Sequence, residues 1–386
     1  MTDGPTAPDA AEPAAAEAAS ACPLTPDFLA PNMRKHVDPK APVPLRMMAA
    51  KGLVPLSPSD MVCVLFMLMY DPEEKVRTTA GEQAQKLPDR IAATAFRDEQ
   101  VNPAVLGWFL ELYVTNDSYA EMLILNGGTP DDAVARVAAT CGLRTAEIIG
   151  QNQLRLLRHD DIIRELAKNP IAQGALIDGV CDFAVRSGMA LADVPQMTAA
   201  RVRLFGPQAA TEPPPAEGPT ADEMISEFGG EGQEQAAPLE EGKRLNLGQK
   251  IMKMNVSEKI KLATKGNKEA RSILIRDSNR LVSVATIRSP RITEGEVMAQ
   301  AQNRVASDEV LRVITSNREW MRNYGIKMAL VKNPKVPQAI AMKLLNQLHE
   351  SDVKALARDK NVPGTVQQMA KKMVSKKTEA KGEGGH

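Results

Sequence analysis

Residues 326–337, Ile-Lys-Met-Ala-Leu-Val-Lys-Asn-Pro-Lys-Val-Pro, constrain the fold more than any other stretch of the chain. An apolar helical end runs into an Asn-Pro break, and a second proline follows three residues later. Proline disfavours α geometry in the residue before it, so Asn333 and Val336 are excluded from a helix, whereas Pro334 or Pro337 suits the first turn of the next one. The stretch therefore predicts a joint between two helices.

Related joints occur along the chain. Residues 358–363, Arg-Asp-Lys-Asn-Val-Pro, carry the same pattern with one proline moved, and weaker versions lie at 97–103, 123–130 and 167–170. In the second half, joint-like positions are separated by 22, 28, 16 and 28 residues and fall at Asn267, Ser289, Asn317, Asn333 and Asn361. Such spacing favours paired short helices with variable turns over one strict period.

Composition favours an all-α fold and a reduced, cytoplasmic protein. Aromatic residues make up only 3% of the chain against 19 methionines, which suits thin helical layers better than β-sandwiches. The most apolar run, residues 61–70, is about half the length that a bilayer crossing needs, so we expect a buried helix and no membrane insertion. The four cysteines form no CxxC pair, and the N-terminus lacks a secretory pattern.

Composition also divides the chain into five parts. We expect a disordered or irregular arm over 1–58, a helical domain over 59–205, an acidic Pro/Gly-rich linker over 206–242, a basic helical domain over 243–374 and a disordered tail over 375–386. The linker holds nine acids and no Lys or Arg. Its apolar island at 224–228 is either a solvated stretch or a docking peptide for a partner or for the chain's own helices.

The joints at 333–337 and 353–363 resemble the leucine-rich-repeat-variant and HEAT-like helical repeats of uncharacterised bacterial cytoplasmic proteins. The resemblance covers residues 245–374 well and 59–200 loosely. It implies two α-solenoid blocks joined by the acidic linker, with the usual role of binding other macromolecules. Iron–sulfur relatives of this type carry an N-terminal cysteine cluster that this chain lacks, and no glycosylase acid maps onto a position here.

No catalytic or metal-binding pattern stands out. The four histidines have neither HxxxH nor HExxH spacing, and no phosphate loop, nucleophile elbow or dinucleotide fingerprint occurs. His159-Asp160-Asp161 is the one cluster of interest, and Asp160 there suits a helix cap better than a metal ligand. We expect no catalytic, cofactor-binding or metal-binding residue and no enzymatic activity.

Charge is distributed unevenly. Residues 243–386 hold 29 Lys and Arg against 13 Asp and Glu, in a chain whose net charge is zero. The cations that we select as candidate polyanion- or partner-binding residues are Lys259, Lys261, Lys265, Lys268, Arg271, Arg276, Arg280, Arg288 and Arg291.

Three functions remain open. The first is a scaffold or adaptor that binds an unidentified protein partner, and the second is binding of nucleic acid or another polyanion by the basic half. The third is a HEAT-like DNA-repair enzyme. The acidic linker can neutralise the basic half within the same molecule, in which case it would act as an autoinhibitor.

Overall fold

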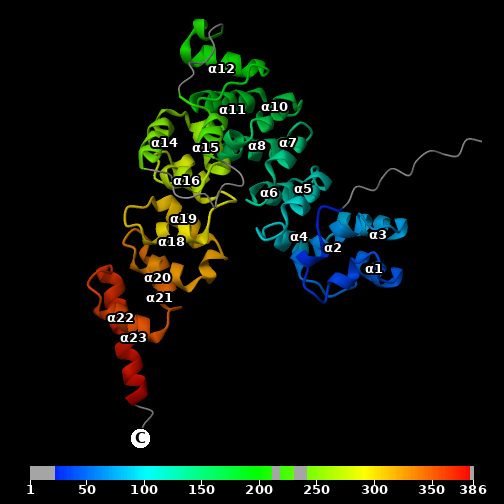
Figure 1. Cartoon of the computed structure of the whole chain (residues 1–386). Coiled ribbons are helices and arrows are strands. Elements are labelled where there is room, and N and C mark those ends of the chain that lie inside the picture. The colour runs from blue at the N-terminus through cyan, green and yellow to red at the C-terminus, as the bar shows by residue number, and fades with distance from the viewer. Residues whose placement is uncertain (1–21, 211–217, 230–240, 383–386) are drawn as a thin grey trace, which may run out of the picture. The chain divides into compact units, whose positions relative to one another are not determined.

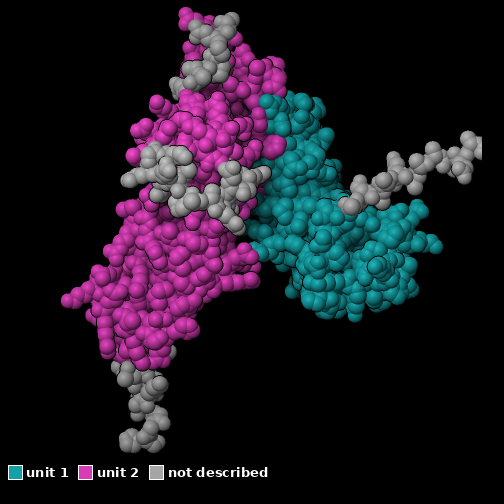
Figure 2. Space-filling view, viewed as in Figure 1, with its two compact units in different colours: residues 1–152, 161–177 teal, residues 153–160, 178–386 magenta. Residues whose placement is uncertain are grey.

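The computed structural model describes residues 22–210, 218–229 and 241–382, and within these ranges the chain is all-α, as predicted (Figure 1). No described helix combines the length and apolar character of a bilayer span. The chain divides into two compact units, residues 1–152 with 161–177 and residues 153–160 with 178–386 (Figure 2).

Unit 1 contains η1 (Pro26–Phe28), η2 (Arg34–His36), α1 (Val43–Ala50), α2 (Pro58–Leu68), α3 (Glu74–Gln85), α4 (Asp89–Ala95), α5 (Pro103–Leu112), α6 (Asp117–Leu125), α7 (Asp131–Ala138), α8 (Leu143–Gln151) and α10 (Asp161–Lys168). α11 (Gly174–Arg186) continues into unit 2. Unit 2 contains α9 (Gln153–Arg158), α12 (Pro195–Phe205), η3 (Pro207–Ala210), α13 (Ala221–Phe228), α14 (Glu241–Lys253), α15 (Val256–Lys265), α16 (Lys268–Leu274), α17 (Arg280–Ile287), α18 (Glu294–Gln302), α19 (Asp308–Ser316), η4 (Trp320–Arg322), α20 (Tyr324–Lys332), α21 (Gln338–Leu345), α22 (Glu350–Arg358) and α23 (Gly364–Gly382).

The division between the units falls earlier than the domain boundary expected from composition. The turn after α11 belongs with the helices of the basic half, because the Ser257 amide donates to the Ser187 carbonyl at 3.2 Å and the Asn255 side chain donates to the Gly188 carbonyl at 3.1 Å. Gly188 has a φ of +83°, and a Cβ there would meet the Asn255 side chain. Composition gave no sign of these backbone contacts.

The described parts of the arm, linker and tail are more helical than expected. The arm contains η1, η2 and α1, and it is held by an ion pair between Arg46 and Asp71 whose side chains are 5% and 2% exposed. The apolar island of the linker forms α13, and α23 continues to Gly382 through most of the expected tail. The rest of the predicted arm, linker and tail, residues 1–21, 211–217, 230–240 and 383–386, lies outside the described residues.

The predicted joint at Asn333 is an Asx turn. Asn333 ends α20, its side-chain oxygen accepts the Lys335 amide at 2.9 Å, and Val336 is buried. In an Asx turn the side-chain oxygen replaces a backbone carbonyl as the hydrogen-bond acceptor. The chain can therefore leave the helix while the amide two residues on still has a partner. The same contact, from an Asx oxygen to the amide two residues on, recurs at Asp71, Asp98, Asn126, Asn169, Asp277, Asn303 and Asp359.

At three of these turns a buried asparagine also bridges to a neighbouring helix. The Asn333 amide donates to the carbonyls of Ala301 and Asn303, both at 2.9 Å. Asn126 does the same to Phe96 and Asp98, and Asn169 to Ala138 and Cys141, at distances between 2.8 and 3.2 Å. Carbonyls at a helix end have no partner within the helix, so each asparagine satisfies two of them while closing its own turn.

In unit 2, four helices have the same number of residues between the cap at their start and the Asx turn that follows them. α16, α18, α20 and α22, which we call the A helices, each begin at a cap residue and are followed by an Asx residue ten positions after that cap. The caps are Asn267, Thr293, Asn323 and His349, and the closing residues are Asp277, Asn303, Asn333 and Asp359. Both series advance by 26, 30 and 26 residues, and the longer step contains η4.

This interval corrects the assignment of joints made from the sequence. Asn333 corresponds to Asp359, because both accept the amide two residues on, and Asn361 only supplies that amide. Asn267 is a cap at the opposite end of an A helix, where its oxygen accepts the Ala270 amide, and Asn317 ends a helix of the other layer. The joint-like positions therefore mixed residues at the starts and at the ends of helices in both layers, which produced the uneven spacing.

Polar contacts join the first turns of successive A helices. Arg271 on α16 contacts Glu296 on α18, the Asn323 amide donates to Glu294 at 2.6 Å, and the Tyr324 hydroxyl donates to Asp352 on α22. In the second layer α15 packs on α17 and α17 on α19. The A helices are thus joined to one another at their first turns, and Asn333 also joins the end of α20 to the end of α18.

We expect Asn333→Ala to lower the free energy of unfolding by about 3 kcal/mol, because it removes the turn and leaves two helix-end carbonyls without their donor. Asn361→Ala is the matched control: its side chain is exposed, and we expect a change within about 0.5 kcal/mol. Urea unfolding of the full chain measures both. Equal midpoints for the two variants would contradict the bridging role of Asn333.

Candidate partner-binding surface

The nine cations selected from the sequence do not form one surface. Arg271 is 1% exposed: its guanidinium donates to both carboxylate oxygens of Glu296, at 3.0 and 3.2 Å, and to the Gly266 carbonyl at 3.1 Å. The Lys259 ammonium lies 2.8 Å from Asp277, and these side chains are 15% and 12% exposed. Both cations hold elements of the chain together, which leaves Arg271 and Lys259 little exposed surface for a polyanion.

Of the remaining seven, three have an intramolecular contact. Lys261 lies 3.2 Å from Glu258, Arg280 lies 3.4 Å from Glu309, and Arg291 donates to the Lys265 carbonyl at 3.3 Å. The exposed residues Lys265, Lys268, Arg276 and Arg288 are divided between the two ends of the A helices. Lys268 begins α16 and Arg276 follows its end, so about 12 Å of helix separates them at 1.5 Å per residue.

A different set of cations lies at equivalent positions. The residue nine positions after the cap is Arg276 on α16, Lys332 on α20 and Arg358 on α22, and all three are exposed. Exposed cations in the following turns are Arg304, Lys335 and Lys360. Of these six the sequence selection contained only Arg276, because the selection followed the local density of charge; the interval of 26 and 30 residues relates Arg276 to Lys332 and Arg358, and Arg304 to Lys360.

A groove lies beside these cations in unit 2. It has a volume of about 560 Å³ and is formed by α18, α20 and the first turn of α22. The thioethers of Met298 and Met328 supply its apolar part, and Gly325 leaves room between them, since a Cβ there would meet the Met298 methyl group. The residues that line it are Met298, Gln302, Arg304, Tyr324, Gly325, Met328, Ala329, Lys332, Asn333 and Asp352.

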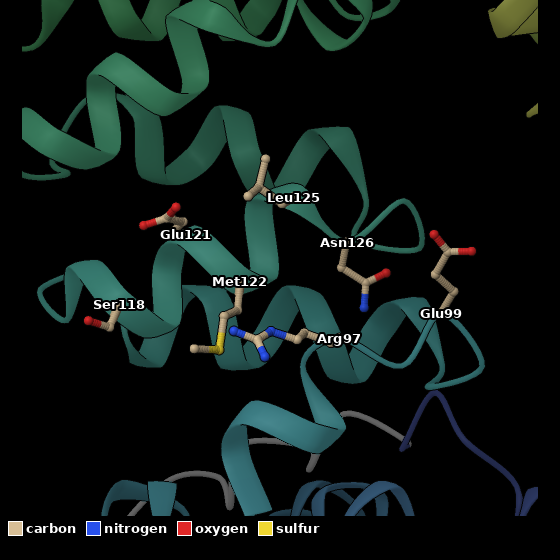
Figure 3. A pocket seen from close by; sticks show the side chains of 7 residues that line it. All are labelled: Arg97, Glu99, Ser118, Glu121, Met122, Leu125 and Asn126. Atoms are coloured by element: carbon tan, nitrogen blue, oxygen red, sulfur yellow. The ribbon is translucent and has the colours of Figure 1, made fainter. Parts of the chain in front are cut away.

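A smaller groove of about 320 Å³ lies in unit 1 (Figure 3). It is formed by α6 and the turn after α4, and Arg97 extends from that turn toward Met122. The other lining residues are Glu99, Ser118, Glu121, Leu125 and Asn126. Leu125 is 60% exposed although it is apolar.

The two grooves occupy the same place relative to their helices. α4 and α6 also run from a cap, Pro88 or Asn116, to an Asx residue ten positions later. Counted from these caps, Leu125 corresponds to Lys332, and Glu99, the residue after the first Asx, corresponds to Arg304. The grooves thus share a backbone position, and at these two positions the side chains are apolar and acidic in unit 1 and basic in unit 2.

Tyr324 forms one end of the groove in unit 2. Its hydroxyl donates to Asp352 and accepts the His349 amide at 3.1 Å, and its ring lies 4.6 Å from the His349 ring. Burial and the hydrogen bond to Asp352 raise the pKa of Tyr324, so the phenol stays neutral. Lys332 lies 3.6 Å from Asp359, and Arg304 donates to the Asn361 carbonyl at 3.0 Å. Both rim cations are therefore positioned by the turn at 359–361.

Nothing in the described ranges points to a metal or to nucleophilic chemistry. No three His, Cys, Asp or Glu side chains there cluster closely enough to hold a metal ion. Burial raises the pKa of Cys63, Cys141 and Cys181 to about 11, so their thiols are protonated at neutral pH and pack as small apolar groups.

Glu296→Gln tests the structural role of Arg271. Burial alone would raise the pKa of Glu296, but hydrogen bonds from Arg271 and Thr293 lower it overall. A depressed carboxyl pKa stabilises the fold above the unfolded value near 4.5, and this stabilisation is lost as the pH falls through the folded value. We expect the variant to lose about 3 kcal/mol at pH 7 and the deficit to shrink below pH 4.5 in urea melts. A pH-independent deficit would contradict this ion pair.

Comparison of the chain with models of known protein families, with curated proteins and with solved structures found no match.

Proposed function

We propose that the protein is a non-enzymatic helical-repeat scaffold, and that the groove on the A helices of unit 2 binds an acidic segment of a protein partner. One observation carries this proposal: a groove recurs at the same position in both units, and in unit 2 its rim bears Arg304 and Lys332. A groove that keeps its place on the helices while the charge of its side chains changes is consistent with a binding surface adapted to one ligand.

The packing of the helices supports the scaffold architecture. Helices two apart in the chain lie against each other in both units, for example α5 on α7, α6 on α8, α15 on α17 and α18 on α20. This arrangement of stacked helix pairs is that of HEAT-like and related α-solenoids, in which each pair contacts its neighbours. This packing supports our proposal that each unit is an α-solenoid, the class that the joints resemble.

The spacing of the rim cations favours an extended peptide. Packed helices lie about 8–10 Å apart, and α18 and α20, whose ends carry Arg304 and Lys332, pack on each other. Every third residue of an extended peptide advances about 10 Å, which lets its acids meet successive cations. Met298 and Met328 between them suit an apolar side chain of the same peptide, since methionine adapts to varied ligands.

Binding of nucleic acid is the second candidate, and the row of Arg276, Lys332 and Arg358 favours it. Base stacking has little support on this face, because Tyr324 is held by Asp352 and His349. Contacts would then be to phosphates, and binding would weaken steeply with salt. Binding of a peptide that also contacts methionines should depend much less on the salt concentration.

The test uses the full chain and a displayed library of random peptides. We expect selected peptides to combine two or more acids with an apolar residue, and Arg304→Glu with Lys332→Glu to weaken their binding at least tenfold by fluorescence anisotropy. Arg288→Glu is the control, because Arg288 is exposed and lies outside the groove. Equal losses in the two variants, or tighter binding of single-stranded RNA that the double variant abolishes, would refute the peptide site.

A further inference from the structure

The helix α13 is part of the acidic segment at 206–242, and it packs on α15. A capping box between Thr220 and Glu223 begins the helix. Two of its side chains are buried, Ala221 at 2% and Met224 at 1% exposed. The apolar island at 224–228 had two interpretations from composition, a solvated stretch or a docking peptide. In the structure it packs on the chain's own helices.

Three helices of the basic half contact α13 through polar groups. Glu258 of α15 accepts the Ala221 amide at 2.8 Å, and the Asn267 side chain at the start of α16 donates to the Phe228 carbonyl at 2.8 Å. Lys250 of α14 binds Glu227 at 2.6 Å, and its ammonium lies 5.4 Å from the centre of the Phe228 ring. We call the surface formed by Lys250, Glu258 and Asn267 the α13 site.

The α13 site recognises a short helix by several independent features. Lys250 selects an acid near the C-terminal end, Glu258 accepts an amide at the N-terminal end, and Asn267 binds a carbonyl after the last turn. Met224 adds an apolar side chain in the middle. An amphipathic helix with an acid three residues after a methionine meets all of these requirements.

α13 is held more weakly than its neighbours in the same layer. It buries two residues, whereas α15 buries four and α17 five. Ordering eight residues costs backbone entropy at every position, and burial of one methionine and one alanine offsets only part of that cost. The ion pair of Glu227 and Lys250 is 45% and 33% exposed, so it adds little.

We propose that α13 is a displaceable internal ligand, and that the α13 site receives an acidic amphipathic helix of a protein partner. Because α13 is tethered to the same chain, its effective concentration at the site is in the millimolar range. A partner binds only if its own affinity and concentration together outcompete this tethered helix. α13 therefore sets a minimum affinity and concentration that a partner must have before it occupies the site. This site is separate from the groove on α18 and α20, and the proposal holds whether or not that groove binds a peptide.

Substitutions that weaken α13 should open the site. Met224→Ser removes its main buried side chain, and Met252→Ser on α14 is the matched control because Met252 is 80% exposed. Gly218→Ala acts from outside the helix: Gly218 has a φ of +88°, and a Cβ there would collide with the Lys253 carbonyl. Its control is Gly206→Ala, with a similar φ of +92° and no atom within 4 Å of the added Cβ.

The probe is a fluorescent peptide with the sequence of residues 218–229, titrated against full-length variants. We expect it to bind Met224→Ser and Gly218→Ala at least tenfold more tightly than the wild type, Met252→Ser or Gly206→Ala. Adding Lys250→Glu to Met224→Ser should abolish that binding, and a peptide with Glu227→Lys should restore part of it.

Three results would overturn the proposal. The first is equal peptide affinity for all variants. The second is a thermal melt in which Met224→Ser destabilises the whole of unit 2 as much as Val282→Ala in the core of α17, since α13 would then be an integral helix. The third is a wild-type dimer that Met224→Ser dissociates, because the occupant would then be a second copy of this chain.

Discussion

The arrangement of helices depends on one interaction, the bridge from a buried asparagine amide to two carbonyls at the end of a neighbouring helix. Asn333, with 2% of its surface exposed, closes α20 and binds the end of α18 in the same contact. Only asparagine offers both an acceptor for the turn and two donors for the neighbour in so small a side chain. The distance between adjacent helix ends, and hence the width of the groove beside them, follows from that geometry.

The joint, the all-helical class and the uneven charge could all be predicted from the sequence. Proline geometry acts on the nearest residues, so the Asn-Pro break at Asn333 is visible locally. The interval could not be read by matching asparagines, because Asp359 fulfils the turn role of Asn333 while lacking its donors. Val336 and Val362, each three residues after its Asx residue, would have aligned these two turns.

The candidate site was harder to predict, because local charge density does not distinguish structural cations from free ones. Arg271 lies in the densest basic stretch and is wholly buried against Glu296. Arg304 and Lys332 are far from that stretch in sequence, yet adjoining helices bring both to one groove. The linker posed a similar problem: its composition is that of an extended chain, and only the apolar island at 224–228 and the Thr220–Glu223 capping pair indicate α13.

The central claim, that the groove of unit 2 binds an acidic peptide, is tested most directly by NMR of the full chain with ¹³C-labelled methionine methyl groups. The 19 methionines provide probes in both units. On addition of a selected acidic peptide, we predict that the signals of Met298 and Met328 shift together with one affinity, while exposed Met252 stays unchanged. Shifts confined to methionines outside the groove would contradict the account.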